Sequence, residues 1–180
     1  MDAPRKYSPT AMALHWLIAA LVIYNMMFPP EFEDVGHDVA PEVAAGMTAL
    51  HIGLGLSILV LMIFRLFWRV GHHAPPLPDT MAAWEARLAR TMHWLIYIAV
   101  FAMVLLGFAT ALLAPYPAAA FGVLPVAGFL GPNEALHEII KEIHHTGNKV
   151  IIALVVVHVA AAAYHAFVKK DGVLRSMLPW

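Results

Sequence analysis

The sequence contains no cysteine and few charged residues. The lack of cysteine among 180 residues excludes disulfide bonds, thiolate-bound iron–sulfur clusters and haem attached through a C-x-x-C-H motif. Only 13% of the residues are charged, whereas an ordinary soluble domain has about 25%. Hydrophobic residues make up 61% of the chain, and the net charge of −1 gives no indication of nucleic-acid binding. This composition indicates a membrane protein.

Four apolar stretches are long enough to cross a bilayer, which takes roughly 17–25 helical residues. They span residues 11–28, 47–68, 93–114 and 150–168. The first contains His15 and Trp16 and lacks a small-residue cleavage pattern, so we interpret it as a retained helix and not a signal peptide. We therefore predict one domain over residues 1–180, an all-α integral membrane four-helix bundle.

The charges are sorted between the two sides of this bundle. Nine of the eleven basic residues lie near the termini or the second connection, and eight of the twelve acidic residues lie in the first and third connections. Basic residues near helix ends stay on the cytoplasmic side, so we expect both termini to be cytoplasmic. The third connection is long for an unstructured loop, and we expect a short outer helix at 133–142.

Histidines are unusually frequent in these apolar stretches. Five lie within or at the edges of the predicted spans and two lie at an outer end: His15, His51, His93, His158 and His165, and then His144 and His145. A single histidine in a helix bundle is usually a packed or interfacial residue. Ionisable residues inside spans are rare, however, and so many in one small bundle favour a functional site.

Helical spacing sorts four of the histidines into two pairs. His158 follows His144 by fourteen residues, which places both within about 40° of one helix face and about 21 Å apart. His145 is about 140° from His158 and is expected to face elsewhere. By depth, His15 is level with His158 in the inner half, and His51 is level with His144 near the outer end.

Opposed imidazoles from facing helices suit the two axial positions of a haem iron. Neutral imidazole is the form that ligates, and filling both axial positions leaves one-electron transfer as the main chemistry. Arg65 follows His51 by fourteen residues and is a candidate partner for a haem propionate. It is equally explained as an anchor at the inner membrane edge.

Several stretches together resemble the prokaryotic cytochrome b561 family. They are ALHWL with His15, ALHIGLGLSILVLMIFRLFWR with His51 and Arg65, HWLIY with His93, the pattern of His144 and His158, and the tail KKDGVLRSMLP. The resemblance covers nearly the whole chain. It implies a multi-pass protein of the bacterial inner membrane that holds two b haems, ligated by His15 with His158 and by His51 with His144, and that exchanges electrons with ubiquinone.

One activity in that family is the oxidation of superoxide at the outer face. Lys141 and Lys149 would steer this anion, whereas the eight outer acids favour a cationic periplasmic partner such as a basic cytochrome c. The residues that flank the outer ligand, Ile143 and His145, differ from the Trp and Glu expected from the family. Two alternatives are an electron-transfer anchor subunit of a dehydrogenase or hydrogenase, and a transporter or metal-binding bundle without haem.

The quinone site has two candidate residues on the inner side. His165 follows His158 by seven residues and returns to within about 20° of the same face, which also makes it a rival ligand to His158. His93 opens the third span. Each is also explained as an ordinary interfacial histidine. The remaining histidines lie in connections and are expected to be solvated: His37, His72, His73 and His137.

Overall fold

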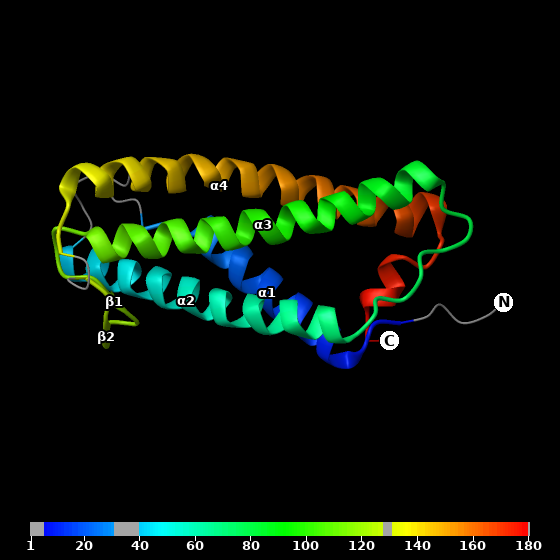
Figure 1. Cartoon of the computed structure of the whole chain (residues 1–180), viewed down its shortest axis with the longest axis horizontal. Helices are drawn as coiled ribbons and strands as arrows, with labels where there is room; N and C mark the ends of the chain where they lie inside the picture. The colour runs from blue at the N-terminus through cyan, green and yellow to red at the C-terminus, as the bar shows by residue number, and fades with distance from the viewer. Residues whose placement is uncertain (1–5, 31–39, 128–130, 180) are drawn as a thin grey trace.

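Helices make up most of the protein. The computed structural model describes residues 6–30, 40–127 and 131–179. Its long helices are α1 (Pro9–Met27), α2 (Pro41–Gly71), α3 (Ala83–Leu113) and α4 (Glu134–Ala163). A π-helical turn, η1 (Tyr164–Lys169), continues α4 and is followed by a short 3₁₀ helix, η2 (Leu174–Met177). All four long helices are apolar enough to cross a membrane, which confirms the predicted four-helix membrane bundle (Figure 1).

Side-chain and backbone caps fix where the helices begin. The Ser8 hydroxyl accepts a hydrogen bond from the Ala11 amide at 3.3 Å, and Pro9 opens the first turn of α1. The Asn133 amide oxygen does the same for α4, because it accepts from the Leu136 amide at 3.1 Å. These contacts satisfy amide groups that have no partner inside the first helical turn.

The helices extend beyond the predicted spans. Helix α2 begins at Pro41 instead of residue 47, and α3 begins at Ala83 instead of residue 93. The short helix expected at 133–142 is not separate, because it is the first part of α4. Hydropathy identifies only the part of a helix that lipid covers, and a helix continues through polar sequence until a breaker ends it. Gly147 lies within α4, where it packs closely against the Met103 side chain.

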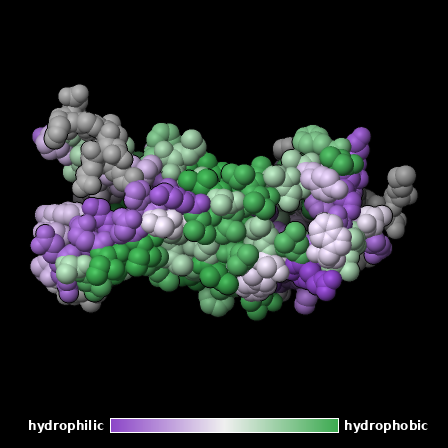
Figure 2. All heavy atoms as spheres, turned by 90° about the horizontal axis from the view of Figure 1, so that it is seen from above, coloured by the Kyte–Doolittle hydropathy of each residue, from purple (hydrophilic) through white to green (hydrophobic). Residues whose placement is uncertain are grey.

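The two ends of the bundle differ in what they carry. The start of α1, helix η2 and the connection at 72–82 all lie at one end, and the third connection lies at the other (Figure 1). The Trp16 indole donates to the Met177 carbonyl at 2.9 Å, which joins the C-terminal segment to α1. An apolar band lies between two polar ends (Figure 2). The positive-inside rule therefore places both termini at the cytoplasmic face of the membrane.

A two-stranded hairpin covers the outer end of α2. Strands β1 (Ala119–Ala120) and β2 (Leu124–Pro125) pair antiparallel, with Ala119 opposite Pro125. Between them, Phe121 has a φ of +53°, and its amide donates to the Ala49 carbonyl at 2.8 Å. Its ring lies over Gly53, where a Cβ atom would come within 2.5 Å of the ring. Only glycine admits this contact, so Gly53 sets where the hairpin sits.

His137 corrects one of the sequence-based expectations. It belongs to α4 and is 1% exposed, whereas we expected it to be solvated in a connection. Its Nδ1 donates to the Thr110 carbonyl at 2.9 Å, and its ring meets the Tyr116 ring edge-on. The error has the same cause as the helix bounds, because α4 starts earlier than the apolar pattern indicates and carries His137 against α3. His37 lies outside the described residues.

Candidate functional site: two histidine pairs

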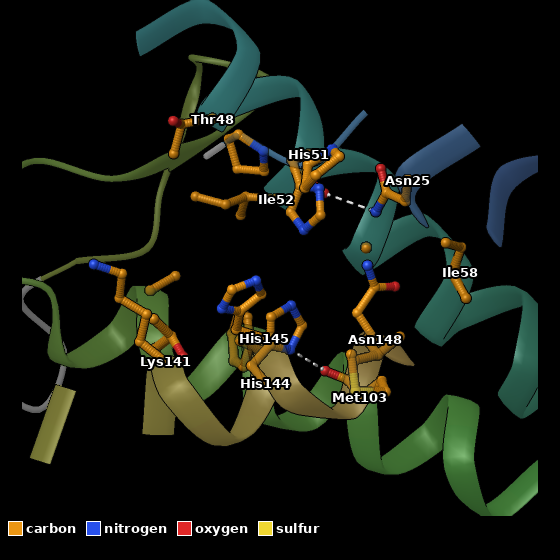
Figure 3. A pocket seen from close by; sticks show the side chains of 18 of the residues that line it. Asn25, Thr48, His51, Ile52, Ile58, Met103, Lys141, His144, His145 and Asn148 are labelled. Carbon is orange, nitrogen blue, oxygen red and sulfur yellow. Dashed lines mark hydrogen bonds between the residues drawn. The ribbon is translucent and has the colours of Figure 1, made fainter. Parts of the chain in front are cut away.

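His51 of α2 and His144 of α4 face each other across a cavity near the outer end. Their ring centroids are 6.2 Å apart, and the rings are nearly perpendicular at 88°. The cavity has a volume of about 480 Å³ and is lined by residues of all four helices. Both rings point into it (Figure 3). An imidazole nitrogen binds a metal at about 2 Å, so this separation leaves room for one metal ion between opposed rings.

The surroundings of His144 prepare it as a ligand. Its Nδ1 lies 3.0 Å from the Met103 carbonyl oxygen, which can only accept, so Nδ1 carries the proton. The Nε2 lone pair is then available to a metal, and the carbonyl makes the ring more basic. The His144 ring packs against α3 at Gly107, where a Cβ atom would lie only 2.8 Å from His144 Cε1.

His51 leaves a polar atom without a partner. Its Nδ1 is buried and has no hydrogen-bond partner in the part of the chain that the structure describes. Asn25 lies beside it and donates from Nδ2 to the His51 carbonyl at 3.2 Å (Figure 3). The rings of His51 and His144 thus face each other across a largely apolar cavity, and one nitrogen of His51 has no protein partner. This arrangement fits a flat apolar cofactor with a metal at its centre.

The inner end has a second facing pair with a third histidine beside it. The rings of His15 and His158 are 6.2 Å apart at 68°, and His93 lies 5.6 Å from His158. Arg65 Nη2 is 3.0 Å from His15 Nδ1, and the guanidinium stacks over Tyr97 at 5.5 Å. Since arginine only donates, His15 Nδ1 accepts in this arrangement, and its proton is on Nε2. Arg65 thus contacts the inner pair directly.

Helix α4 joins the two pairs. It runs without interruption from Glu134 to Ala163 and carries both His144 and His158. Fourteen residues of α-helix correspond to a rise of about 21 Å. The pairs therefore lie at two levels of one bundle, as the spacing predicted.

The mouth of the outer cavity carries both acidic and basic side chains. Glu138, Lys141, Glu142 and His145 all line it. Lys141 pairs with Glu138 at 3.6 Å, which reduces the positive charge it offers to an anion, and Lys149 lies exposed further along α4. His145 corrects a second expectation, because it lines this cavity next to His144 instead of facing away (Figure 3). The estimate of about 140° gave the direction of His145 around the helix axis relative to His158. Because His158 lies deep in the bundle, that angle does not describe the wider outer end of the cavity.

The quinone candidates lie in different surroundings. His93 belongs to the inner histidine group, whereas His165 of η1 lies 2.5 Å from Asp171 Oδ2. The carboxylate accepts from His165 Nδ1, and its other oxygen accepts from the Val173 amide at 3.2 Å. His165 is therefore directed toward the C-terminal segment at the cytoplasmic face.

Sequence reasoning missed several residues around the outer pair. Asn25, Asn148, Met103 and Gly107 line the cavity together with His145. Asn25 was detectable, because a carboxamide is rare within an apolar span and often marks a polar contact, whereas Asn148 lies just outside the predicted span 150–168. The Met103 carbonyl left no signal, since any residue type supplies a backbone acceptor.

Comparison with known proteins agrees with this geometry. A family model described as prokaryotic cytochrome b561 matches residues 6–180. Cytochrome b561 homolog 1 of Escherichia coli (strain K12) is 29% identical and aligned over 97% of both chains. Probable superoxide oxidase CybB of Yersinia pestis is also 29% identical over 97% of both. Cytochrome b561 homolog 2 of the same E. coli strain is 27% identical over 98% of this chain and 93% of its own. The chain therefore belongs to the prokaryotic cytochrome b561 family of haem-b electron-transfer proteins.

Proposed function

We propose that the protein holds two b haems and carries electrons between the outer face of the membrane and a quinone at the inner face. His51 with His144 would bind the outer haem, and His15 with His158 the inner one. The observation that carries this proposal is the repeated geometry, because both pairs come from facing helices with the same centroid separation of 6.2 Å. Bound haem would supply one-electron redox chemistry.

The histidines of each pair occupy opposite sides of the space between them. If both histidines of a pair bound the iron, no coordination site would remain for oxygen, and the bound group would supply electron transfer and not oxygen activation. Apolar side chains line the interior, as in the cluster of Ile58, Val100 and Ile151.

Arg65 would serve the inner site in two ways. It is a donor with the planar geometry that suits a propionate carboxylate. Its present contact with His15 Nδ1 leaves the proton on Nε2, so ligation through Nε2 requires Arg65 to release Nδ1. A propionate would draw the guanidinium away, and His15 would then bind as the neutral imidazole.

Ligand variants test the haem assignment. A pyridine haemochrome assay on the purified protein is expected to give two b haems per chain. His51→Ala and His144→Ala are each expected to remove one haem, and His15→Ala and His158→Ala the other. Unchanged visible spectra for His51→Ala and His158→Ala would refute the proposal.

Superoxide is the proposed electron donor at the outer face. Two superoxide ions would each lose one electron to give oxygen, and one quinone would take up both electrons and two protons to give a quinol. The name of the Yersinia relative supports this donor, and Lys141 at the cavity mouth would attract the anion within about 8 Å. Lys149 would add charge nearby.

Stopped-flow decay of superoxide, with oxidised quinone present, tests this donor. The wild-type protein is expected to accelerate decay, and Lys141→Glu to slow it, while Lys170→Glu at the cytoplasmic end serves as the matched charge control. Decay no faster than the spontaneous rate would exclude superoxide.

A cationic redox partner is the second candidate donor. Glu138 and Glu142 line the mouth, and their charge would attract a basic periplasmic protein. In that case reduction by a basic cytochrome c would weaken steeply with salt and on Glu138→Gln.

On the inner side, His93 and His165 are the proposed quinone contacts. Either imidazole would donate a hydrogen bond to a quinone carbonyl. His93 lies beside the inner pair, because its ring contacts that of His158. His165 lies with Asp171 at the cytoplasmic surface, where protons are available. Quinone reduction by dithionite-reduced His93→Leu and His165→Leu proteins would identify which one acts.

A further inference from the structure

Asn25 and His51 each carry a buried polar atom without a hydrogen-bond partner. In the described part of the chain, Asn25 Oδ1 and His51 Nδ1 are the buried side-chain atoms left in this state. The two residues touch, since Asn25 Nδ2 donates to the His51 carbonyl at 3.2 Å. Both line the outer cavity. Unpartnered polar atoms inside a membrane bundle are costly, so two in contacting residues require an explanation.

The two atoms are complementary in hydrogen bonding. A carboxamide oxygen can only accept, and a neutral imidazole that offers Nε2 to a metal carries its proton on Nδ1. His144 already has this arrangement, because its Nδ1 donates to the Met103 carbonyl at 3.0 Å. On the other side of the cavity, Asn25 contacts His51, because its Nδ2 donates to the His51 carbonyl at 3.2 Å (Figure 3).

We propose that Asn25 is a positioning residue for His51. When His51 binds iron, its Nδ1–H donates to Asn25 Oδ1, so that both outer ligands have an acceptor behind them. Such acceptors fix the ring orientation and raise the basicity of a ligating imidazole. A more basic ligand stabilises the oxidised iron, so Asn25 lowers the midpoint potential of the outer haem. This inference rests on the proposed ligation of the outer haem by His51.

The Asn25 carboxamide has some room to change its orientation. Asn25 lies against the turn of α2 between His51 and Gly55, where the nearest neighbour of a Cβ atom at Gly55 would be Asn25 Nδ2 at 3.9 Å. A distance of 3.9 Å is not crowded. Asn148, the other cavity asparagine, belongs to α4 and offers a control of the same chemistry in the same cavity.

Redox titration of the haem-loaded protein, followed by visible and EPR spectra, tests the proposal. Asn25→Leu is expected to raise the midpoint potential of the outer haem and to leave the inner one unchanged. Asn25→Asp, a stronger acceptor, is expected to lower it and to shift the EPR g-values. Asn148→Leu and Asn148→Asp control for the loss of cavity polarity and for the added charge, and they are expected to change the outer potential less.

Equal shifts for the corresponding Asn25 and Asn148 variants would overturn the proposal, as would an unchanged potential in Asn25→Leu at full haem content. If Asn25→Leu loses the outer haem, its retention in Asn25→Asp supports the acceptor role, and its loss from both variants overturns it. The haem content of His51→Ala tests the ligation separately, so failure of the proposed function is distinguishable from failure of this inference.

Discussion

Gly107→Ala tests the link between packing and ligand geometry most directly. The new methyl carbon would lie 2.8 Å from His144 Cε1, whereas ordinary contact begins at 3.4 Å, so the ring has to move by about 0.6 Å. Met103 lies one turn away on the same helix, so this movement lengthens the distance from His144 Nδ1 to the Met103 carbonyl from 3.0 Å. At about 3.6 Å no hydrogen bond remains.

The overall stability should fall moderately. Alanine favours a helix over glycine by about 1 kcal/mol, whereas a lost hydrogen bond costs about 0.5–1.5 kcal/mol and crowding of the ring costs about 1–3 kcal/mol, so the net loss is about 0.5–3.5 kcal/mol. Loss of an acceptor behind a metal ligand typically costs about 10–100-fold in metal affinity. We therefore expect a folded protein that binds the outer haem about 10–100-fold more weakly.

Haem transfer to excess apomyoglobin, followed optically, measures this change. Gly46→Ala is the matched control, because it makes the same substitution in α2 with nothing within 4 Å of the new atom. The outer haem should leave Gly107→Ala faster than the inner haem, and Gly46→Ala should behave like the wild type. Equal retention of both haems in Gly107→Ala would refute the reasoning.

Three further predictions concern other parts of the molecule. Gly53→Ala should displace the Phe121 ring and destabilise the protein by about 1–3 kcal/mol. Its melting temperature should be lower than that of Gly46→Ala. Trp16→Phe removes the hydrogen bond to the Met177 carbonyl and should cost about 0.5–1.5 kcal/mol, with faster proteolysis at the C-terminus. His93→Leu should keep two haems in the pyridine haemochrome assay, because His93 is not a proposed ligand; loss of one would identify it as a ligand.

The histidine pairs followed from sequence because helical geometry is regular. His144 and His158 needed only the residue count between them, and His15 and His51 only their depth in an apolar stretch. The structure brings each expected pair together at the same separation. Whether these pairs bind haem stays a prediction.

Features that depend on where a helix begins or ends could not be predicted from the sequence in the same way. Hydropathy marks lipid contact, so it gave no warning that α4 begins at Glu134 and buries His137. The place of His145 depends on how wide the cavity mouth is, which one helix cannot reveal. The acceptor behind His144 is a backbone carbonyl of another helix, and only tertiary packing brings it there.

The unbroken course of α4 constrains how this chain can change. One inserted residue between His144 and His158 would turn one imidazole by about 100° relative to the other, and would separate it from its partner on the neighbouring helix. Seven residues restore the direction to within about 20°, but they alter the interval between the two levels by about 10 Å. Connecting loops are free to vary in length, whereas the number of residues between these two histidines is fixed by the pitch of the helix.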